Sequence, residues 1–338
     1  MLKTLARDGL AGAVCSVALS GAVSAATPAE FYKTKRMQLY VGTTPGGEYD
    51  TQSRLVSRHL GRHIPGNPSF VVQNMPGGGG IKMALWLFNV PAKDGTNMGV
   101  IGNNFPAMQA VGHPSVKIDF TRFNWIGAIA PVVETLGVWH TTGVTKFEDL
   151  KTKTVIAGAT GTASITYLYP TIMNKYLGTK IKVVPGYSGG SIINAALEKG
   201  EVQARNNSWS SWKATKAQWL KEGKVRVIVQ AGPKAKDLNV PSLEDLAAND
   251  NDRKIIGLVV SGAYLGRPLA LTPAVPADRV AAMRKAFDDT MKDPVFLAET
   301  KKLRFDIDPV RGEDMQAYLA KLMTFPKALV PQARELIR

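Results

Sequence analysis

Residues 37–50 read MQLYVGTTPGGEYD, and this stretch contains the pattern on which the fold assignment rests. Residues 37–41 are mostly apolar and predict a strand. A loop rich in glycine and threonine follows at 42–47, and a helix is predicted over 50–63, with Leu55, Val56 and Leu60 on its apolar side. A strand, a glycine loop and a helix in this order are typical of α/β proteins.

The same unit recurs along the chain. Further strands are predicted at 69–73, 97–101, 154–157, 181–184 and 225–230, and helices at 81–89, 165–177 and 191–199. Strands that alternate with helices favour parallel sheets. We therefore expect an α/β fold of two domains, each a mostly parallel sheet flanked by helices.

Two long apolar stretches suggest where the chain crosses between the domains. We interpret residues 125–140 and 255–271 as two extended crossover connections, and the helical segments after residue 277 as returning to cover the first domain. The predicted boundaries follow from these crossings: a first domain of residues 26–130 and 255–338, and a second domain of residues 131–254.

The N-terminus has the features of a secretory signal peptide. Lys3 and Arg7 precede an apolar run at 9–23, which ends in Val-Ser-Ala at residues 23–25. The run is too short to span a bilayer, so we predict cleavage after Ala25 and a periplasmic location. Cys15, the only cysteine, lies within this segment, and the remaining chain can form no disulfide.

The chain is strongly basic, with a formal net charge of +15. Such a charge can attract nucleic acid, an anionic membrane or an anionic small molecule. The basic residues are scattered, and no nucleic-acid-binding motif accompanies them. We expect an anionic small molecule as the partner and no nucleic acid.

The glycine loops predict where a ligand binds. In parallel α/β sheets, ligands lie outside the carboxyl ends of the strands, where helix N-termini offer free N–H groups to an anion. We expect neutral donors of these loops to hold a carboxylate. The candidate ligand-binding residues are Thr44, Gly46, Gly47, Tyr49, Asn103, Asn104, Thr160, Gly161, Thr162, Ser164, Tyr187, Ser188, Gly189, Gly190, Asn207 and Trp209, with Asn206 and Phe105 as secondary candidates.

One motif favours a different function. Residues 186–190, GYSGG, match the G-x-S-x-G nucleophile elbow of hydrolases and lie between a predicted strand and a predicted helix. In that fold the catalytic histidine follows the serine. The four histidines all precede Ser188: His59, His63, His113 and His140. An exported serine hydrolase that uses Ser188 therefore stays as the alternative to a binding protein.

Cofactor and metal sites are not predicted. The loop at 77–83 lacks the spacing of a phosphate-binding P-loop. His59 and His63 have the spacing of helical metal ligands, but Arg58 and Arg62 beside them would repel a cation. We interpret these four residues as a solvated basic face.

Together, several loops resemble those of one receptor family. Residues 45–50 are similar to its P-G-G-x-x-D loop, 73–79 to its E-N-x-P-G-A-G element, and 93–96 to its P-D-G-Y/T turn. Residues 158–164 resemble its small-residue loop and 184–190 its V-P-Y-x-G-G element. The chain thus resembles the Bug-type substrate-binding receptors of tripartite tricarboxylate transporters. Gly186 is inserted relative to that pattern, and Gln203 stands where the family usually has an acidic residue.

The resemblance implies both a fold and a function. It implies a two-domain Venus-flytrap receptor, monomeric and not an enzyme, that grips a small carboxylated molecule with loops of both domains. It also implies delivery of that molecule to a separate membrane permease.

Overall fold

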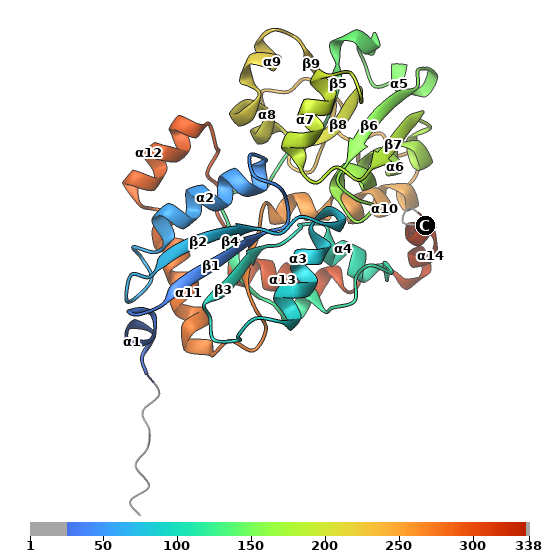
Figure 1. Ribbon diagram of the computed structural model, residues 1–338. Helices are drawn as coiled ribbons and strands as arrows, with labels where there is room; N and C mark the ends of the chain where they lie inside the picture. Colours follow the sequence, from blue (N-terminus) through green and yellow to red (C-terminus); the bar gives the residue numbers. More distant parts are fainter. Residues whose placement is uncertain (1–25, 336–338) are drawn as a thin grey trace, which may run out of the picture.

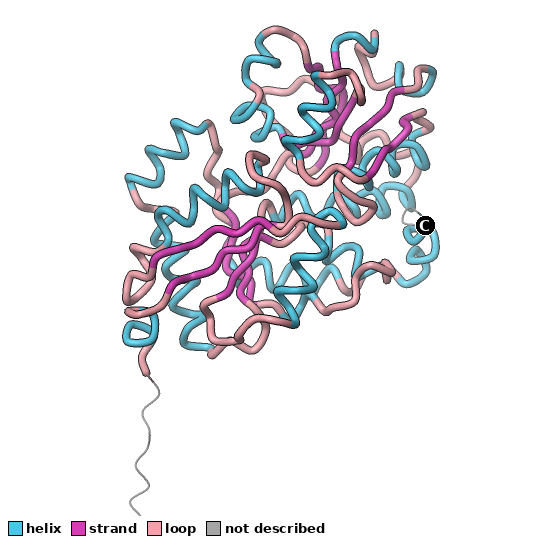
Figure 2. The backbone as a smooth tube through the Cα atoms, in the orientation of Figure 1, coloured by secondary structure: helices cyan, strands magenta, loops and turns pink. Residues whose placement is uncertain are grey.

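The computed structural model describes residues 26–335, so the predicted signal peptide lies outside the described residues. Figures 1 and 2 show two lobes that lie side by side, each built around its own sheet. We call the part around the six-stranded sheet the first lobe and the part around the five-stranded sheet the second lobe. The predicted two-domain α/β class is confirmed, whereas the residue boundaries of the domains stay a prediction.

The sheet of the first lobe has the strand order β11-β4-β10-β3-β1-β2. Its strands are β1 (Arg36–Val41), β2 (Ser69–Asn74), β3 (Asn97–Val100), β4 (Asn124–Ala128), β10 (Leu269–Leu271) and β11 (Val310–Arg311). Its helices are α1 (Pro28–Tyr32), α2 (Glu48–Leu60), α3 (Ile81–Asn89), α4 (Phe105–Ala110), α11 (Ala277–Thr290), α12 (Pro294–Leu303) and α13 (Gly312–Leu322).

Strand β1 shows why helices cover both faces of this sheet. Side chains alternate along a strand, and Met37 and Leu39 pack into one core with Leu55 of α2. Tyr40 points to the opposite core, which includes Leu87 of α3. The apolar strand at 37–41 is thus buried from both sides, as the sequence predicts for an α/β sheet.

The second lobe has the strand order β7-β6-β8-β5-β9. Its strands are β5 (Glu134–Trp139), β6 (Val155–Ala159), β7 (Ile181–Pro185), β8 (Ala204–Ser208) and β9 (Val225–Ala231). Its helices are α5 (Asp149–Thr152), α6 (Ile165–Leu177), α7 (Gly190–Glu198), α8 (Trp209–Thr215) and α9 (Ala217–Lys221).

Both sheets are mixed rather than mostly parallel. The β-α units supply parallel pairs, β1 with β2 and β3 in one sheet and β6 with β7 and β8 in the other. The strands next to the lobe crossings run the other way. In the first lobe β10 is antiparallel to β3 and β4, and in the second lobe β5 is antiparallel to β8 and β9. A chain that passes directly from one lobe into the other need not return through a crossover helix, so these strands can pair antiparallel.

The prediction of an extended segment over 255–271 is wrong for most of its length. Helix α10 (Asp250–Val260) and a 3₁₀ turn (Ser261–Leu265) occupy it before β10. The Asn249 side chain caps α10 by accepting a 2.9 Å hydrogen bond from the Asp252 amide. Ile255, Ile256 and Val260 are fully buried. A continuous apolar run does not distinguish a buried strand from a buried helix, and the N-cap was the available signal.

The last described helix contacts both lobes, because Arg334 donates a 2.6 Å hydrogen bond to the Val111 carbonyl next to α4 (Figure 1). In α14 (Val330–Arg334) and the turn before it, Leu329 and Ala333 join the hydrophobic core that contains β5 and β6 residues. Tyr176 of α6 donates a 3.3 Å hydrogen bond to the Gln332 carbonyl. Within residues 26–335, no helix is long and apolar enough to cross a membrane.

Candidate functional site

A cavity of 70 Å³ lies between the lobes, at the carboxyl ends of β1, β3, β6 and β8. Both lobes and the segment that connects them contribute to its wall. The first lobe supplies Gly42, Thr43, Gly47, Glu48, Tyr49, Gly79, Gly80, Val100, Gly102 and Asn104; the second supplies Thr160, Ser164, Ile165, Thr166, Gly190, Arg205, Asn206 and Asn207; the connecting segment supplies Arg267.

The loops on either side of the cavity touch each other. The Thr44 amide donates a 3.3 Å hydrogen bond to the Ser188 carbonyl across the lobes. The Ser191 hydroxyl donates a 2.9 Å hydrogen bond to the Pro45 carbonyl. Gly189 is required here, because a Cβ on it would lie 2.0 Å from the Thr44 hydroxyl oxygen. The structure therefore represents the lobes in a closed arrangement.

The sequence-predicted residues fall into four places. Those that line the central cavity are Gly47, Tyr49, Asn104, Thr160, Ser164, Gly190 and Asn207, with the secondary candidate Asn206. Those that line a separate 460 Å³ opening beside the glycine loop are Gly161, Thr162, Tyr187 and Ser188. Thr44, Gly46 and Gly189 lie at the lobe contact, and Trp209 lines a 650 Å³ opening on a different part of the lobe boundary.

Asn103 and Phe105 lie outside these four places, and the Ser164 side chain has a structural contact as well. The side-chain oxygen of Asn103 accepts a 3.3 Å hydrogen bond from the Tyr49 hydroxyl, and the backbone N–H of Asn103 donates to the same hydroxyl. Phe105, considered for the pocket wall, is fully buried in the core beside α3. The hydroxyl of Ser164 donates to the Gly161 carbonyl and so stabilises its own loop.

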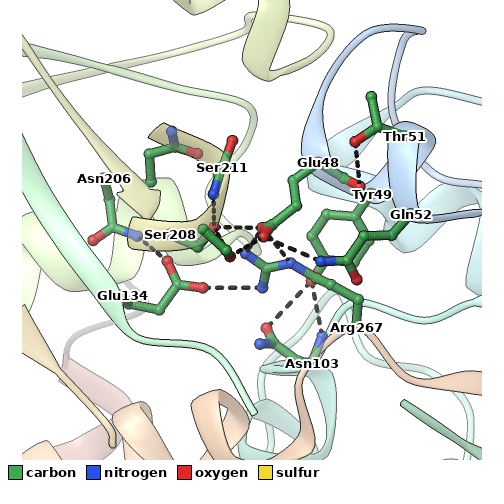
Figure 3. Close-up of polar contacts among 12 residues, drawn as sticks. Glu48, Tyr49, Thr51, Gln52, Asn103, Glu134, Asn206, Ser208, Ser211 and Arg267 are labelled. Carbon is green, nitrogen blue, oxygen red and sulfur yellow. Dashed lines mark hydrogen bonds and ion pairs between the residues drawn. The ribbon is translucent and has the colours of Figure 1, made fainter. Parts of the chain in front are cut away.

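A buried ionic network that the sequence analysis missed lies next to the cavity (Figure 3). Arg267 Nη1 lies 2.9 Å from Glu134 Oε1, and Arg267 Nη2 lies 2.5 Å from Glu48 Oε2. All three side chains are at most 3% exposed. The guanidinium also lies over the Tyr49 ring, 4.6 Å from its centroid.

The network joins the lobes. Glu48 belongs to α2 of the first lobe, and Glu134 begins β5 of the second. The Ser208 hydroxyl, at the end of β8, donates a 2.6 Å hydrogen bond to Glu48 Oε2, and the Ser210 hydroxyl donates to Glu48 Oε1. Closing the lobes thus completes the hydrogen bonds of a buried carboxylate.

The charges of this network influence one another strongly. Burial raises the pKa of Glu134, although the Arg267 cation opposes the rise. Burial by itself would lower the pKa of Arg267, but Glu48, Tyr49 and Glu134 more than offset this effect and the pKa is raised. Arg267 therefore keeps its charge, and its cation is shared between two carboxylates.

Arg205 is a second buried arginine on the cavity wall, and its surroundings differ. It lies on β8, is 5% exposed, and has its guanidinium 5.5 Å from the Trp212 ring. Its four hydrogen bonds go to uncharged oxygens, namely the carbonyls of Gly190 and Asn206 and the side chains of Asn194 and Asn207. Among residues 26–335, no carboxylate forms an ion pair with it. Burial lowers the pKa of Arg205 to about 10.

The expectation that neutral donors dominate the site therefore needs revision, because two arginines belong to the cavity wall. A local signal for part of this set was present in the sequence. Within 255–271 the only charged residue is Arg267, and within 125–140 the only acidic residue is Glu134. A single charge inside a long apolar stretch indicates a buried ionic group with a partner elsewhere in the fold.

The geometry around Ser188 does not support a nucleophile elbow. That motif holds its serine in a strained turn, yet Ser188 is not among the described residues with a left-handed backbone. In the described part of the chain, no histidine forms a hydrogen bond with Ser188; the loop's backbone instead bonds Thr44 of the other lobe. The alternative of a serine hydrolase gains no support from this arrangement.

The predicted solvated face at His59 and His63 is wrong. His59 is 3% exposed, and its Nε2 lies 2.6 Å from Glu299 Oε2. His63 Nε2 lies 2.8 Å from Asp293 Oδ2. His59 of α2 thus contacts α12, which packs beside it, and His63 in the turn after α2 contacts Asp293, the N-cap residue of α12. Residues 26–335 contain no group of three or more histidine, cysteine or acidic residues that could hold a metal ion.

Comparison with solved structures places this arrangement among known folds. The periplasmic binding protein BugD is similar at a TM-score of 0.68 and 18% identity, over 89% of this chain and 96% of that chain. A protein from R. palustris with adipate gives 0.69 and 20%, over 90% and 97%. The chain has the fold of a periplasmic binding protein.

A third similar structure is MatC from Rhodopseudomonas palustris with bound malate, at a TM-score of 0.67 and 17% identity over 90% of this chain and 99% of that chain. The resemblance to Bug-type receptors is thus confirmed at the level of the fold. No protein-family model and no curated protein sequence matches this chain.

Proposed function

We propose that this protein is an exported solute-binding receptor that holds a small carboxylated molecule between its lobes. The observation that carries the proposal is the central cavity, which loops of both lobes and the connecting segment enclose. A ligand at that position contacts both lobes at once, so its binding free energy favours the closed arrangement. The cavity wall also holds Arg205, a buried cation without an acidic partner among the described residues, which suits an anionic group.

We further propose that the receptor works in the periplasm as a monomer and delivers its ligand to a membrane permease of the tripartite tricarboxylate transporter type. The resemblance of its loops to Bug-type receptors supports this, as do the similar structures with bound adipate and malate. We propose no enzymatic activity and no cofactor.

A thermal-shift screen of carboxylated metabolites tests the proposal. A true ligand at about 100 times its dissociation constant should stabilise the protein by about 2.7 kcal/mol. The same compound should be recovered unchanged after prolonged incubation. If no carboxylate stabilised the protein, the proposed function would be rejected.

An ester-turnover assay tests the alternative of a serine hydrolase. Turnover of a generic ester by the wild type, lost in Ser188→Ala, would replace the receptor with an enzyme. Ser188→Ala is expected to leave the melting temperature unchanged, because the Ser188 side chain is exposed.

A further inference from the structure

The charges around the cavity constrain which carboxylates can bind. Four side chains with a formal charge lie at or directly behind its wall, and each is at most 5% exposed: Glu48, Glu134, Arg205 and Arg267. Two are acidic and two are basic, so their formal charges cancel. A ligand that enters this site meets a set of buried charges that is already balanced.

All three hydrogen bonds of the Arg267 side chain go to carboxylates of the protein itself. Its Nε and Nη2 donate to Glu48, and its Nη1 donates to Glu134. The Tyr49 ring lies over the flat side of the guanidinium. Arg267 therefore belongs to an internal cluster with two carboxylates, and this cluster has a formal charge of −1.

Glu48 brings that negative charge to the cavity wall. Its two oxygens accept five hydrogen bonds, from Gln52, Ser208, Ser210 and two nitrogens of Arg267. No further donor is needed to satisfy it. A second carboxylate brought close to Glu48 would be repelled, and the low polarity of the closed site strengthens this repulsion.

Arg205 is a cation of the cavity wall that has no acidic partner among the described residues. A guanidinium has five N–H groups, and four hydrogen bonds to uncharged oxygens are present. Arg205 Nη2 donates to Asn207 Oδ1 at 3.0 Å, which leaves the Asn207 Nδ2 group without a partner. The remaining N–H of Arg205 and the amide of Asn207 together form a pair of neighbouring donors.

Asn206 adds the opposite type of group. Its Nδ2 donates a 2.9 Å hydrogen bond to Glu134, and its Oδ1 has no partner. The charge of Glu134 therefore fixes the amide with its oxygen free as an acceptor. The hydroxyl of Thr43, on the facing lobe, also lacks a partner. These buried groups have no partner among residues 26–335, belong to residues of the cavity wall, and could be satisfied by a polar ligand.

We infer that the ligand carries one carboxylate, held by Arg205 and Asn207, and that its remainder is uncharged or cationic and offers a hydrogen-bond donor to Asn206 Oδ1. This inference rests on the proposed function and narrows it: short dicarboxylates are the disfavoured class. An amide, hydroxyl or ammonium group can approach the side of the cavity near Glu48 without the repulsion that a second carboxylate meets.

Titration calorimetry on the wild-type protein with matched compounds tests this inference. One series is succinate, succinamate and β-alanine, and a second is glutarate, glutaramate and 4-aminobutyrate. In each series the compound length is kept while one carboxylate becomes an amide or an ammonium group. The members with a single carboxylate should bind at least about tenfold more tightly than the dianion.

The outcomes separate the inference from the proposed function. If the dianion bound as tightly as its partners or more tightly, the inference would be wrong and the receptor function would stand. If neither series nor the wider carboxylate screen gave binding, the proposed function itself would fail and the inference with it.

The affinity of an Arg205 variant tests whether this residue holds the carboxylate. Arg205→Gln should weaken the best ligand at least about tenfold, because the buried cation is lost. Arg226→Gln is the matched control, since Arg226 lies exposed on β9 of the same sheet and bonds only the Val144 carbonyl. Unchanged affinity in a folded Arg205→Gln protein would contradict the assignment.

A pH titration needs no variant and so does not depend on whether Arg205→Gln folds. As the pH falls toward the ordinary carboxyl pKa of about 4, a dicarboxylate loses its second charge. Its affinity should rise toward that of the matched monoamide. An affinity ratio that stays constant over this range would also contradict the inference.

Discussion

Removing the cation of Arg267 should destabilise the protein strongly. Arg267→Met keeps much of the side-chain length but leaves Glu48 and Glu134 buried together without a positive partner. Breaking one buried ion pair typically costs about 3–5 kcal/mol. The two carboxylates can instead become neutral by taking up protons, and protonating each one near neutral pH costs about 3.5 kcal/mol of free energy. The expected loss in the free energy of unfolding is therefore about 3–7 kcal/mol.

Urea unfolding followed by circular dichroism measures this loss. The matched control is the triple variant Glu48→Gln, Glu134→Gln, Arg267→Met, which keeps the shapes but removes all three charges of this cluster. The triple variant should be clearly more stable than Arg267→Met alone, because replacing a whole buried ionic set costs far less than breaking it. An Arg267→Met protein within about 1 kcal/mol of wild type, or a triple variant no better than it, would refute the reasoning.

The stability of Arg267→Met should depend on pH in a definite direction. Burial already raises the pKa of Glu134 in the folded protein. A carboxyl group with a raised pKa contributes most to stability below its unfolded pKa, and this contribution is lost as the pH rises through the folded pKa. Loss of the Arg267 cation raises the folded pKa further. Arg267→Met should therefore regain stability relative to wild type as the pH falls from about 8 toward about 5.

Two other predictions concern the lobe contact and the N-cap residue of α12. Gly189→Ala should weaken ligand binding about tenfold and enlarge the radius of gyration of the ligand-saturated protein, because its Cβ would lie 2.0 Å from the Thr44 hydroxyl oxygen in the closed arrangement. Gly257→Ala, where a Cβ meets no atom within 4 Å, is the control, and equal affinity of the two variants would contradict the closure argument. Hydrogen bonds, first of all from His63, lower the pKa of Asp293 from its ordinary value of 3.8. Asp293→Asn should therefore be less stable than wild type above about pH 4, and the difference should shrink steadily as the pH falls from about 4 toward the lowered pKa of the folded protein. A difference that stays constant over this range would point to packing instead.

The loops of the site could be predicted from the sequence, whereas its charges largely could not. The loop at 42–47 is a local feature, because a strand, glycines and a helix follow one another in the chain. The cluster of Glu48, Glu134 and Arg267 joins residues up to 219 positions apart. The apolar stretches around Glu134 and Arg267 indicate that each is buried, but they do not identify the partner, and only the folded lobes bring the three residues together.

The helix at 250–260 shows a second limit. Its first half, residues 250–254, is polar, and the apolar run begins only at Ile255. A prediction from the apolar run alone therefore misses the start of the helix. Strand predictions succeeded where the run was short and a glycine loop followed, as at 37–41 and 181–184. The antiparallel strands next to the crossings were missed as such because strand direction depends on the path of the chain between lobes, which no local pattern encodes.

The position of β10 has a consequence for the order in which the parts of the protein fold. All strands of the second lobe come from one continuous stretch, residues 134–231, so that sheet can assemble as soon as this stretch has emerged. The first sheet cannot, because β10 lies between β3 and β4 and comes from residues 269–271. Until those residues arrive, β4 has no connection to β1, β2 and β3. We expect the central part of the chain to fold first and the N-terminal strands to wait, exposed to chaperones or proteases, for the C-terminal third.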